Sequence, residues 1–486
     1  MHKQKSKLRE RTQLVFIYSL MIAAIVSMLA ILVLVIQGYR YNRFDGRIEQ
    51  GGLVQFNSRP SGATVSVDDI ELANKTASKI TLTAGEHTVK MWRSGYNEWK
   101  KAVDVRPGTV LWLNYTLLFP TKPVVSTGAT FDQVTSVIVA PNNEWLAAVS
   151  NPKSANIHLV RLGTDTPTST SIALPVGSYT AAADETTHSF KVMSWDKDSE
   201  SVLVQHDYDG KREYLVATLR GGEGVYNLTT QLGVDASQVS FSQGDSNVLY
   251  LLTTANELRR ATISSSTLSG PLATNVSGFS ATDDRIITYE TFADSLGKRG
   301  VGYVSGGSNK SKQIASYELA NEVSLHARVG MYYGDRFLTV AHGGSIDIMS
   351  GSLPQSDSND TLDLDTVSRI DAASNLTWVG FSPGDNRMVY AQSGDKLITY
   401  DLELNLQSAI TLPASAARVV DWIDGFHVAT TAGGTATYYD YDGTNVQQIA
   451  DVALDLPIAL SSNDKYLYYF APSEHGVSLY RVRLAE

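Results

Sequence analysis

The chain has 486 residues, of which 43% are hydrophobic and 19% are charged, and its formal net charge is −10 at pH 7. This composition is rich enough in apolar residues to bury cores and excludes a disordered chain. The acidic balance argues against nucleic acid as a partner, because phosphates require a basic footprint. The absence of cysteine excludes disulfides, thiolate metal sites and a cysteine nucleophile.

The first predicted element is a transmembrane helix over residues 14–36. The segment LVFIYSLMIAAIVSMLAILVLVI, from Leu14 to Ile36, has no charged residue. At about 1.5 Å per residue it spans the roughly 30 Å of a bilayer core. It is longer than the apolar part of a signal peptide, about 7 to 15 residues, and no small-residue cleavage site follows it. We therefore expect a retained single-pass anchor rather than a cleaved leader.

The charges beside this segment predict its orientation. Residues 1–13 form a basic tail with five lysines and arginines and one glutamate, a net charge of +4, which leaves −14 for the rest of the chain. The positive-inside rule keeps such a tail in the cytoplasm. We expect a protein of the cell membrane with a cytoplasmic N-terminus, a linker over residues 37–50 and an extracytoplasmic body.

A small β domain is predicted next, over residues 51–118. In the segment VLWLNYTL, side chains alternate between two faces as in a half-buried strand, and one face holds Leu111, Leu113, Tyr115 and Leu117. Three tryptophans in this region, Trp92, Trp99 and Trp112, offer faces for stacking on a sugar. We expect at least two of them to be core or strand-face residues, because the alternation already accounts for them.

Three motifs in this region resemble the PEGA domain, a small β-sandwich of bacterial and archaeal envelope proteins. They are PSGATVSVDD from Pro60, AGEHTVKM from Ala84 and SGYNEWKKAVDV from Ser94. The family's glycine-alanine pair and its later landmarks correspond to Gly62, Ala63, Gly85, Gly95 and Tyr96. The sequence departs from the family at two loop positions, Ser61 and Ala77. The resemblance implies a β-sandwich in an envelope protein.

From about Val134 to the C-terminus, a polar turn followed by an apolar strand occurs eight times, and each copy is followed by a second strand. Runs of β-branched and aromatic residues bounded by Asp, Asn, Gly and Ser are typical of strands and turns. The eight copies are PNNEWLAAVS, DKDSESVLVQ, SQGDSNVLYLL, SATDDRIITYE, YGDRFLTVA, SPGDNRMVYAQ, IDGFHVATT and SSNDKYLYYFA.

A repeat of roughly 40 to 55 residues indicates a β-propeller. We predict an all-β chain in which a propeller occupies residues 122–486, with eight blades or, as the alternative, seven. In its repeat form alone, the ring is similar to WD40-like and TolB-like propellers. The last copy ends at Leu484 and lacks a fourth strand, whereas the segment KPVVSTG, from Lys122 to Gly128, has no sheet of its own. We predict that Val124 and Val125 close the ring by pairing with the strand around Leu479 to Val482.

Few candidate chemical sites emerge, and no catalytic, cofactor or metal residues are predicted. Two Asp-Gly motifs are interpreted as hairpin turns rather than calcium loops, which need more oxygen ligands. An acidic run, Asp357 to Asp365, is interpreted as a solvated loop in the longest insertion between repeats, with a cation or partner site as the alternative. The two motifs comprise Asp207, Asp209 and Gly210, and Asp440, Asp442 and Gly443.

Two hypotheses of function remain. The first is a non-catalytic protein that presents the propeller to another protein or to a cell-wall polymer, because the loops of a propeller converge on two rigid faces. The second is an extracytoplasmic hydrolase or lyase that uses carboxylates in the funnel of the ring. The identity of the ligand-binding residues does not follow from the sequence.

Overall fold

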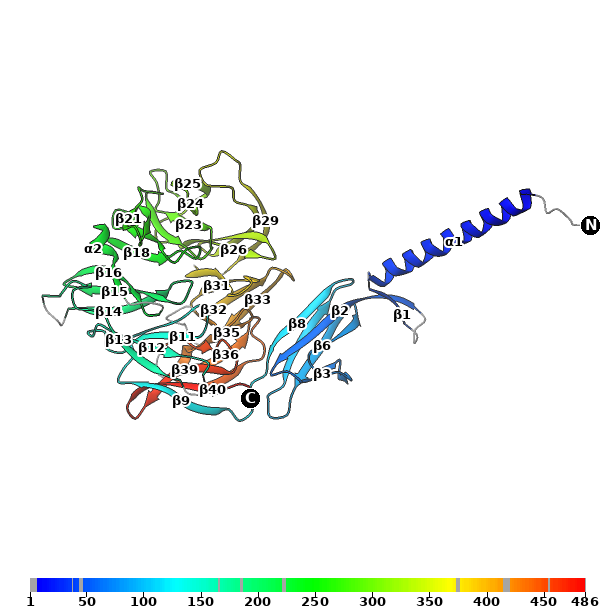
Figure 1. Ribbon diagram of the computed structural model, residues 1–486, viewed down its shortest axis with the longest axis horizontal. Helices are drawn as coiled ribbons and strands as arrows, with labels where there is room; N and C mark the ends of the chain where they lie inside the picture. The colour runs from blue at the N-terminus through cyan, green and yellow to red at the C-terminus, as the bar shows by residue number, and fades with distance from the viewer. Residues whose placement is uncertain are drawn as a thin grey trace, which may run out of the picture. The chain divides into compact units, whose positions relative to one another are not determined.

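The computed structural model describes residues 7–36, 38–42, 47–164, 167–183, 187–220, 224–372, 376–413, 420–452 and 455–485. The chain divides into two compact units, Met1–Lys122 and Pro123–Glu486. Figure 1 shows the helix α1 (Lys7–Ile36) and the many short sheets that make up the rest of the chain.

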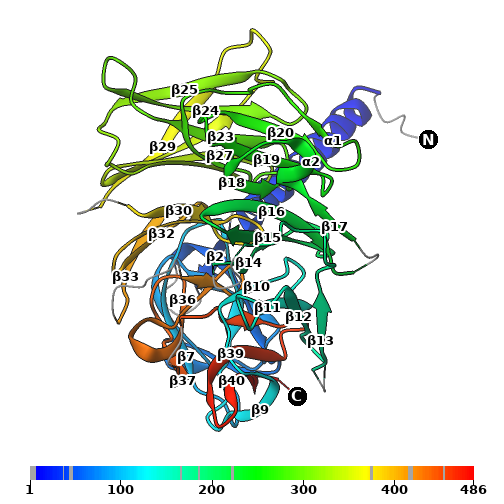
Figure 2. The ribbon, with the colours of Figure 1, turned by 90° about the vertical axis from the view of Figure 1, so that its left-hand side faces the viewer.

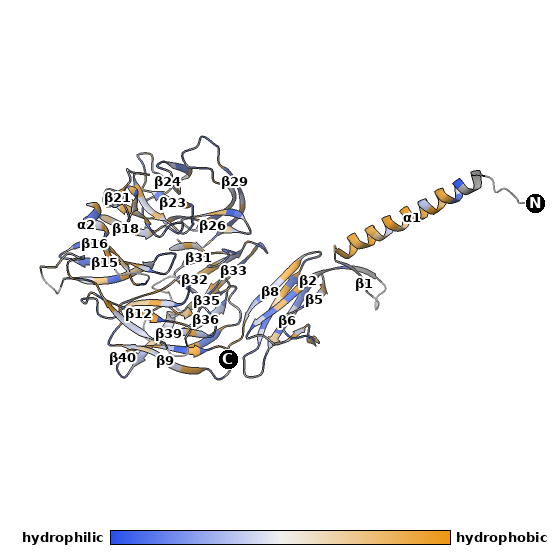
Figure 3. Ribbon diagram, in the orientation of Figure 1, coloured by the Kyte–Doolittle hydropathy of each residue, from blue (hydrophilic) through white to orange (hydrophobic). Residues whose placement is uncertain are grey.

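The helix α1 is long and apolar enough to cross a membrane, over the span Arg11–Ile36. It begins seven residues before the predicted start at Leu14, so part of the basic tail is helical as well. In Figure 3 most of its length has the colour of hydrophobic residues, and the side chains from Leu14 to Ile36 are exposed. This exposure suits a lipid environment, since water would not favour such a surface.

The rest of the first unit contains two four-stranded sheets that enclose one core, which confirms the predicted β-sandwich. In the first sheet β2 pairs with β1, β5 and β8, and the β2–β8 pair is parallel. The core includes Val54, Met91, Trp99 and Leu113. The first sheet consists of β1 (Tyr39–Asn42), β2 (Arg47–Arg59), β5 (Ser78–Thr83) and β8 (Val110–Leu117). The second consists of β4 (Ile70–Glu71), β3 (Thr64–Val67), β6 (Gly85–Trp92) and β7 (Trp99–Val105).

The expected linker over residues 37–50 is wrong in part. The strand β1 and the start of β2 lie within it, and they pair as an antiparallel hairpin from Tyr39 opposite Gln50 to Asn42 opposite Arg47. Tyr39 and Tyr41 alternate with polar residues in β1, but a run of four residues is too short to indicate a strand from the sequence alone. Backbone pairing with the sheet is what orders this segment.

The described part of the second unit forms eight four-stranded antiparallel sheets, so the propeller has eight blades. Blade 1 is β10 (Ser136–Val139), β11 (Trp145–Val149), β12 (Asn156–Arg161) and β13 (Ser169–Ala173). Blade 2 is β14 (Ser189–Trp195), β15 (Ser201–Tyr208), β16 (Lys211–Thr218) and β17 (Gly224–Asn227), followed by the short helix α2 (Leu228–Leu232). Blade 3 is β18 (Ala236–Phe241), β19 (Val248–Thr253), β20 (Leu258–Thr262) and β21 (Thr267–Leu268). Blade 4 is β22 (Val276–Ser280), β23 (Ile286–Thr291), β24 (Lys298–Ser305) and β25 (Ser311–Glu318).

The other four blades follow in chain order. Blade 5 is β26 (Leu325–Tyr332), β27 (Asp335–His342), β28 (Ser345–Ser352) and β29 (Asp363–Asp371). Blade 6 is β30 (Trp378–Phe381), β31 (Met388–Ser393), β32 (Lys396–Asp401) and β33 (Leu406–Thr411). Blade 7 is β34 (Asp421–Trp422), β35 (His427–Thr430), β36 (Thr435–Asp440) and β37 (Gln447–Asp451), with the 3₁₀ turn η1 (Ala432–Gly434). Blade 8 is β38 (Ala459–Leu460), β39 (Tyr466–Ser473), β40 (Gly476–Arg483) and β9 (Val124–Phe131).

The recurring polar turn has one local cause. It connects the first strand of a blade to the second, and in seven blades an Asp or Asn side chain accepts a hydrogen bond from a backbone N–H two to four residues later, which fixes the turn. The acceptors are Asn142, Asp196, Asp245, Asp283, Asp385, Asp424 and Asn463. Blade 5 instead uses a two-residue turn, Tyr333–Gly334, in which both residues have positive φ, 53° and 90°.

Apolar side chains join the blades around the ring. Buried clusters connect blades 1 to 2, 2 to 3, 3 to 4, 4 to 5, 5 to 6, 6 to 7 and 8 to 1. Blades 7 and 8 are linked by a 3.0 Å hydrogen bond from the Ile458 N–H to Asp421 Oδ2. The fourth strands are largely exposed, as in β13 and β33, whereas the first strands are mostly covered. Figure 2 shows the blades after a turn of 90° about the vertical axis of Figure 1.

The ring closes as predicted. The strand β9 pairs with β40, with Val124 opposite Arg483 and Val125 opposite Val482. Figure 1 shows this contact as the cyan β9 beside the red β40. The side chains of Thr130 and Ser478 add a hydrogen bond of 2.9 Å. The first strand of the unit therefore completes its last blade.

Candidate functional site

Both Asp-Gly motifs occupy turns between neighbouring antiparallel strands. Tyr208 pairs with Lys211, so Asp209 and Gly210 form a two-residue turn with φ values of 46° and 74°. Two positive φ values are the mark of a type I′ hairpin. The Asp209 carboxylate accepts hydrogen bonds from the Ala183 N–H and the Thr187 hydroxyl. Asp207 pairs with Arg212 at 2.7 Å.

The second motif follows β36. Gly443 has a φ of 82°, and Asp442 Oδ1 accepts hydrogen bonds from the N–H and the hydroxyl of Thr444. Asp440 is fully buried, and its Oδ2 accepts a hydrogen bond from Asn445 at 2.9 Å. These carboxylates therefore hold the shape of a turn.

The acidic run was placed wrongly by sequence. It lies inside blade 5, between the third and fourth strands, and not between two repeats. Its last residues, Asp363 to Asp365, begin the strand β29. The preceding loop is held by the Lys312 ammonium, which contacts the carbonyl oxygens of Ser358, at 3.1 Å, and Asp360. A basic side chain of the adjacent blade therefore anchors the segment through its backbone.

The tryptophans of the small domain lie on strands. Trp99 is buried in the core and packs edge-to-face against Tyr115, with 6.1 Å between ring centroids. Trp92 on β6 and Trp112 on β8 are partly buried. All three lie on strands, which confirms the expectation that at least two are core or strand-face residues.

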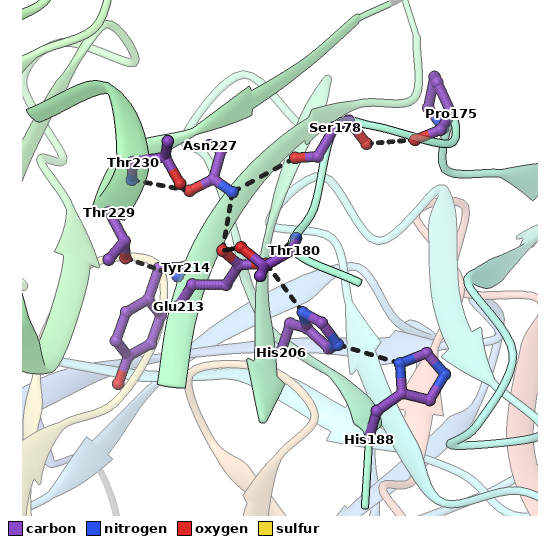
Figure 4. A network of polar contacts seen from close by, with 10 residues as sticks. All are labelled: Pro175, Ser178, Thr180, His188, His206, Glu213, Tyr214, Asn227, Thr229 and Thr230. Carbon is purple, nitrogen blue, oxygen red and sulfur yellow. Dashed lines mark hydrogen bonds and ion pairs between the residues drawn. The ribbon is translucent and has the colours of Figure 1, made fainter. Parts of the chain in front are cut away.

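A buried polar network in blade 2 has the residue types of a catalytic site. Figure 4 shows Glu213 at its centre. Glu213 Oε1 accepts hydrogen bonds from His206 Nδ1 at 2.8 Å and from the Thr180 N–H at 2.7 Å. Its Oε2 accepts from the Thr180 hydroxyl at 2.8 Å and from Asn227 Nδ2 at 2.9 Å. His206 also contacts His188 at 3.2 Å between ring nitrogens.

The contacts of this network hold elements of the fold in place. Asn227 Oδ1 caps α2 by accepting a hydrogen bond from the Thr230 N–H at 3.0 Å, and the His206 ring stacks on Phe190 with centroids 4.2 Å apart. Burial alone would raise the pKa of Glu213, but the hydrogen bonds from His206, Asn227 and Thr180 outweigh burial and lower it to about 2. The carboxylate is therefore ionised and fully engaged, and the network ties the β13–β14 connection to blade 2.

The centre of the ring offers a different kind of site. Two cavities, of about 380 and 620 Å³, are together lined by residues from all eight blades. They therefore lie where the first strands of the blades face one another. We call the second, lined by blades 3 to 7, the larger channel cavity. Its volume falls in the range of small-molecule sites. Its lining includes Gln243, Thr282, Arg328, Trp378, Asn386, Tyr390, Asp421 and Trp422.

Aromatic side chains and one guanidinium form the wall of this cavity on blades 5 to 7. The Arg328 guanidinium carbon lies 4.9 Å from the centre of the Trp378 ring, within cation–π range. Trp378 Nε1 donates a 3.1 Å hydrogen bond to the Tyr390 hydroxyl. The rings of Tyr390 and Trp422 lie 5.2 Å apart. These residues come from β26, β30, β31 and β34, so the packing of three consecutive blades brings them together.

Charged groups behind this wall are deeply buried. Glu290 Oε1 accepts a 2.6 Å hydrogen bond from the Ala327 N–H and lies 3.4 Å from Arg328 Nη1. Burial raises the pKa of Glu290, and the charges of Arg328 and Arg299 oppose that rise. Burial, with the same two arginines, lowers the pKa of His326 to about 4, so this imidazole is neutral at pH 7. Two guanidinium groups thus share one carboxylate.

None of these channel residues was singled out from the sequence. A signal was present, because the segments TWVGF from Thr377 and DWI from Asp421 put a tryptophan in the first strand of two consecutive repeats. First strands line the channel of the ring, so an aromatic residue there points to a site. This signal can be recognised only after the repeats have been aligned with one another as blades.

The aromatic wall requires the backbone at Gly380 to lie close to the Tyr390 ring. A Cβ atom there would lie 2.9 Å from the Tyr390 ring, and that ring already contacts Trp422. We expect Gly380→Ala to lower the free energy of unfolding by about 1 to 3 kcal/mol, because overpacking forces the ring to move. Urea denaturation measures the change. Gly270→Ala is the matched control, since no atom lies within 4 Å of its added Cβ. Equal stability of the two variants would contradict the prediction.

Comparison with known proteins adds the following. Residues 52–118 match the PEGA domain family. No curated protein matches the sequence. Among solved structures, the β-propeller domain of Cps50 (Swd1) from Myceliophteria thermophila is 12% identical, with a TM-score of 0.43, over 67% of this chain and 99% of that one. An oligogalacturonate lyase in complex with manganese is 11% identical, with a TM-score of 0.36, over 60% of this chain and 88% of that one.

The family match falls on the β-sandwich and contains the motifs at Pro60, Ala84 and Ser94. The pairing of the strands establishes the ring independently of these likenesses. The chain therefore carries a PEGA domain at residues 52–118, which follows the apolar helix α1 and precedes an eight-bladed β-propeller.

Proposed function

We propose that this chain is a membrane-anchored binding protein that presents its propeller outside the cytoplasm to another protein or to a polymer of the cell envelope. The helix α1 supplies the anchor, and the basic residues before it favour a cytoplasmic N-terminus. The PEGA domain follows the anchor, and the ring provides a rigid frame whose loops and channel face a partner.

The residues that line the larger channel cavity favour a binding function over a catalytic one. Its lining is dominated by aromatic, amide, hydroxyl and glycine residues, and the described lining residues include one carboxylate, Asp421. Carboxylate-dependent cleavage of a glycan uses two such groups, an acid and a base or nucleophile. Asp421 Oδ2 already accepts the Ile458 N–H at 3.0 Å. Recognition of a partner is therefore the function that this geometry supports best.

The orientation leads to a prediction about protease access. Protease added to intact cells, with any outer layer permeabilised, should degrade the body after Gln37 and leave an N-terminal epitope tag intact. The reason is that the basic tail stays on the cytoplasmic side. Immunoblots against tags at both ends measure the result, and a cytoplasmic marker controls for lysis. A body that stays protected until detergent is added would overturn the proposed orientation.

Binding by the ring is tested by photo-crosslinking in living cells. A photoreactive residue at Asn386, which lines the larger channel cavity, should capture a defined partner. The same residue at Leu406, exposed on the outer strand β33, is the matched control. A partner that is captured from Asn386 but not from Leu406 supports docking at the larger channel cavity. Adducts with bulk lipid alone, from both positions, would count against the proposed function.

A further inference from the structure

Hydrogen-bond donors without acceptors converge on the larger channel cavity. The side chain of Arg328 is 8% exposed, and its Nη1 donates to the Ala327 carbonyl at 2.7 Å and lies 3.4 Å from Glu290. Within the described part of the chain, its buried Nε has no hydrogen-bond partner, and neither has Nη2. A buried donor without an acceptor is costly, so such a group marks a site where an acceptor binds.

Two further donors line the same cavity. The Tyr390 hydroxyl accepts its hydrogen bond from Trp378 and has no acceptor for its own proton among the described residues. Trp422 Nε1 is buried, and no described residue accepts its hydrogen bond. A tryptophan N–H and a guanidinium can only donate. Arg328, Tyr390 and Trp422 thus present a set of donors that an anion satisfies.

Charged residues near the cavity include two arginines. Arg299 and Arg328 both act on the carboxylate of Glu290, and Asp421, the carboxylate in the lining, accepts the Ile458 N–H. Arg299 is already engaged, because its Nε donates to the Thr291 carbonyl and its Nη1 to the Val323 carbonyl. Arg328 is therefore the cation with donors left for a ligand. Its unpaired edge, Nε and Nη2, is the fork that pairs with both oxygens of a carboxylate.

The remainder of the lining suits hydroxyl groups and rings. Gln243, Thr282 and Asn386 are uncharged and offer amide and hydroxyl groups, while Trp422 and Tyr390 offer aromatic faces. Sugar rings present hydroxyls at their edge and C–H groups on their faces, which match amides and aromatic rings respectively. A volume of about 620 Å³ holds a ligand of a few rings.

We propose that the larger channel cavity binds an acidic saccharide, a sugar that carries a carboxylate. The carboxylate pairs with Arg328 and accepts the Tyr390 hydroxyl proton, and small turns of the Arg328 and Trp422 side chains bring Nε and Nε1 into contact. The sugar ring lies against the aromatic wall, and its hydroxyls bond to Gln243, Thr282 and Asn386. This inference rests on the proposed binding function and specifies its ligand.

Calorimetric titration of the full-length chain in detergent tests the inference with three probes. The first is cellobiouronic acid, a disaccharide that ends in glucuronic acid. The second is cellobiose, the neutral counterpart, and the third is N-acetyl-Ala-Phe, a peptide carboxylate of similar size. We expect the acidic disaccharide to bind at least about tenfold more tightly than cellobiose, because a hydrogen-bonded charge supplies the difference. Tighter binding of the peptide, or heat of binding from none of the probes, overturns the inference.

Three variants locate the site. Tyr390→Phe keeps the ring and removes the hydroxyl, and Arg328→Lys keeps the charge and removes the fork. Each should weaken binding of cellobiouronic acid by about tenfold. Tyr214→Phe is the control, because that hydroxyl bonds to the Ser237 carbonyl in another part of the ring. Thermal unfolding checks that each variant is folded, and Tyr390→Phe decides the question if Arg328→Lys does not fold. Wild-type affinity in Tyr390→Phe overturns the inference.

The experiments distinguish a failure of the proposed docking function from a failure of the proposed ligand. If the ring captures a partner from Asn386 in cells while no acidic saccharide binds, the docking function stands and the ligand is wrong. If the saccharide binds and crosslinking from Asn386 recovers nothing but lipid, the cavity is a small-molecule site and the proposed docking role is wrong.

Discussion

Replacing Asp401 with alanine is expected to lower the free energy of unfolding by about 3 to 5 kcal/mol, because it removes the buried carboxylate that accepts two hydrogen bonds from a buried guanidinium. Asp401 is fully buried and accepts two hydrogen bonds from Arg387, at 3.0 Å from Nε and 2.7 Å from Nη2. Arg387 also contacts Glu403, which accepts the Tyr332 hydroxyl of blade 5 at 2.9 Å, and it packs over Phe426 of blade 7. The pair thus supports three consecutive blades.

The electrostatics agree with this expectation. Burial alone would lower the pKa of Arg387, but Asp401 and Glu403 reverse that effect and raise it. Urea denaturation of the full chain measures the loss. Asp371→Ala is the control, since Asp371 is an exposed partner of Arg369 at 3.6 Å and should change stability by less than about 1 kcal/mol.

A double variant separates charge burial from packing. Asp401→Leu combined with Arg387→Met removes both charges and should be more stable than Asp401→Ala, because buried ion pairs are often replaced by apolar residues at little cost. If Asp401→Ala is as stable as the wild type, or if the double variant is less stable than the single one, the role given to this pair is wrong.

Replacing Glu213 with alanine should also cost about 3 to 5 kcal/mol, because it leaves several buried hydrogen-bond donors without an acceptor. The change leaves His206, Asn227 and the Thr180 N–H without an acceptor, because each of them donates a hydrogen bond to this carboxylate. Thermal and urea unfolding measure the effect. Glu213→Gln keeps the shape and should lose less than Glu213→Ala. Equal losses in the two variants would show that hydrogen bonding to this side chain is unimportant.

The same carboxylate predicts a pH dependence. Its pKa is lowered from an ordinary value of 4.5 to about 2, so folding favours the ionised form. The stability that Glu213 contributes, roughly 3 kcal/mol, is fully present above about pH 4.5 and is lost as the pH falls towards 2. Denaturation from neutral pH to about pH 3 should therefore show a steeper loss of stability in the wild type than in Glu213→Gln. Parallel curves would contradict the assignment.

The architecture of the ring could be predicted because its cause is local. In a polar turn of this kind, a side chain accepts a hydrogen bond from the backbone of the same turn, as Asp385 does from the Arg387 N–H. Similar residues therefore recur wherever the same turn recurs. Ring closure followed from counting strands, since the last copy lacked one and Lys122 to Gly128 supplied it. Blade 5 shows that a different turn, Tyr333–Gly334, satisfies the same geometry.

Features that depend on distant pairing could not be predicted. The strand β1 is four residues long, too short for its alternation of tyrosine and polar residues to indicate a strand, and it forms because it pairs with β2. The channel wall joins Arg328, Trp378, Tyr390 and Trp422, whose separations in the chain carry no signal of contact. The polar network of blade 2 likewise joins His188, His206 and Glu213 through the fold alone.

The closure of the ring has a mechanical consequence. Chain tension between the N-terminal helix and the propeller enters the second unit at Pro123, immediately before β9. That strand pairs with β40 on one side and forms the outer edge of its blade. The hydrogen bonds from Val124–Arg483 to Phe131–Val477 therefore carry the load before any other contact of the ring does. Under the proposed membrane anchoring, the strand that closes the ring is also the first strand of the ring to bear a pulling force.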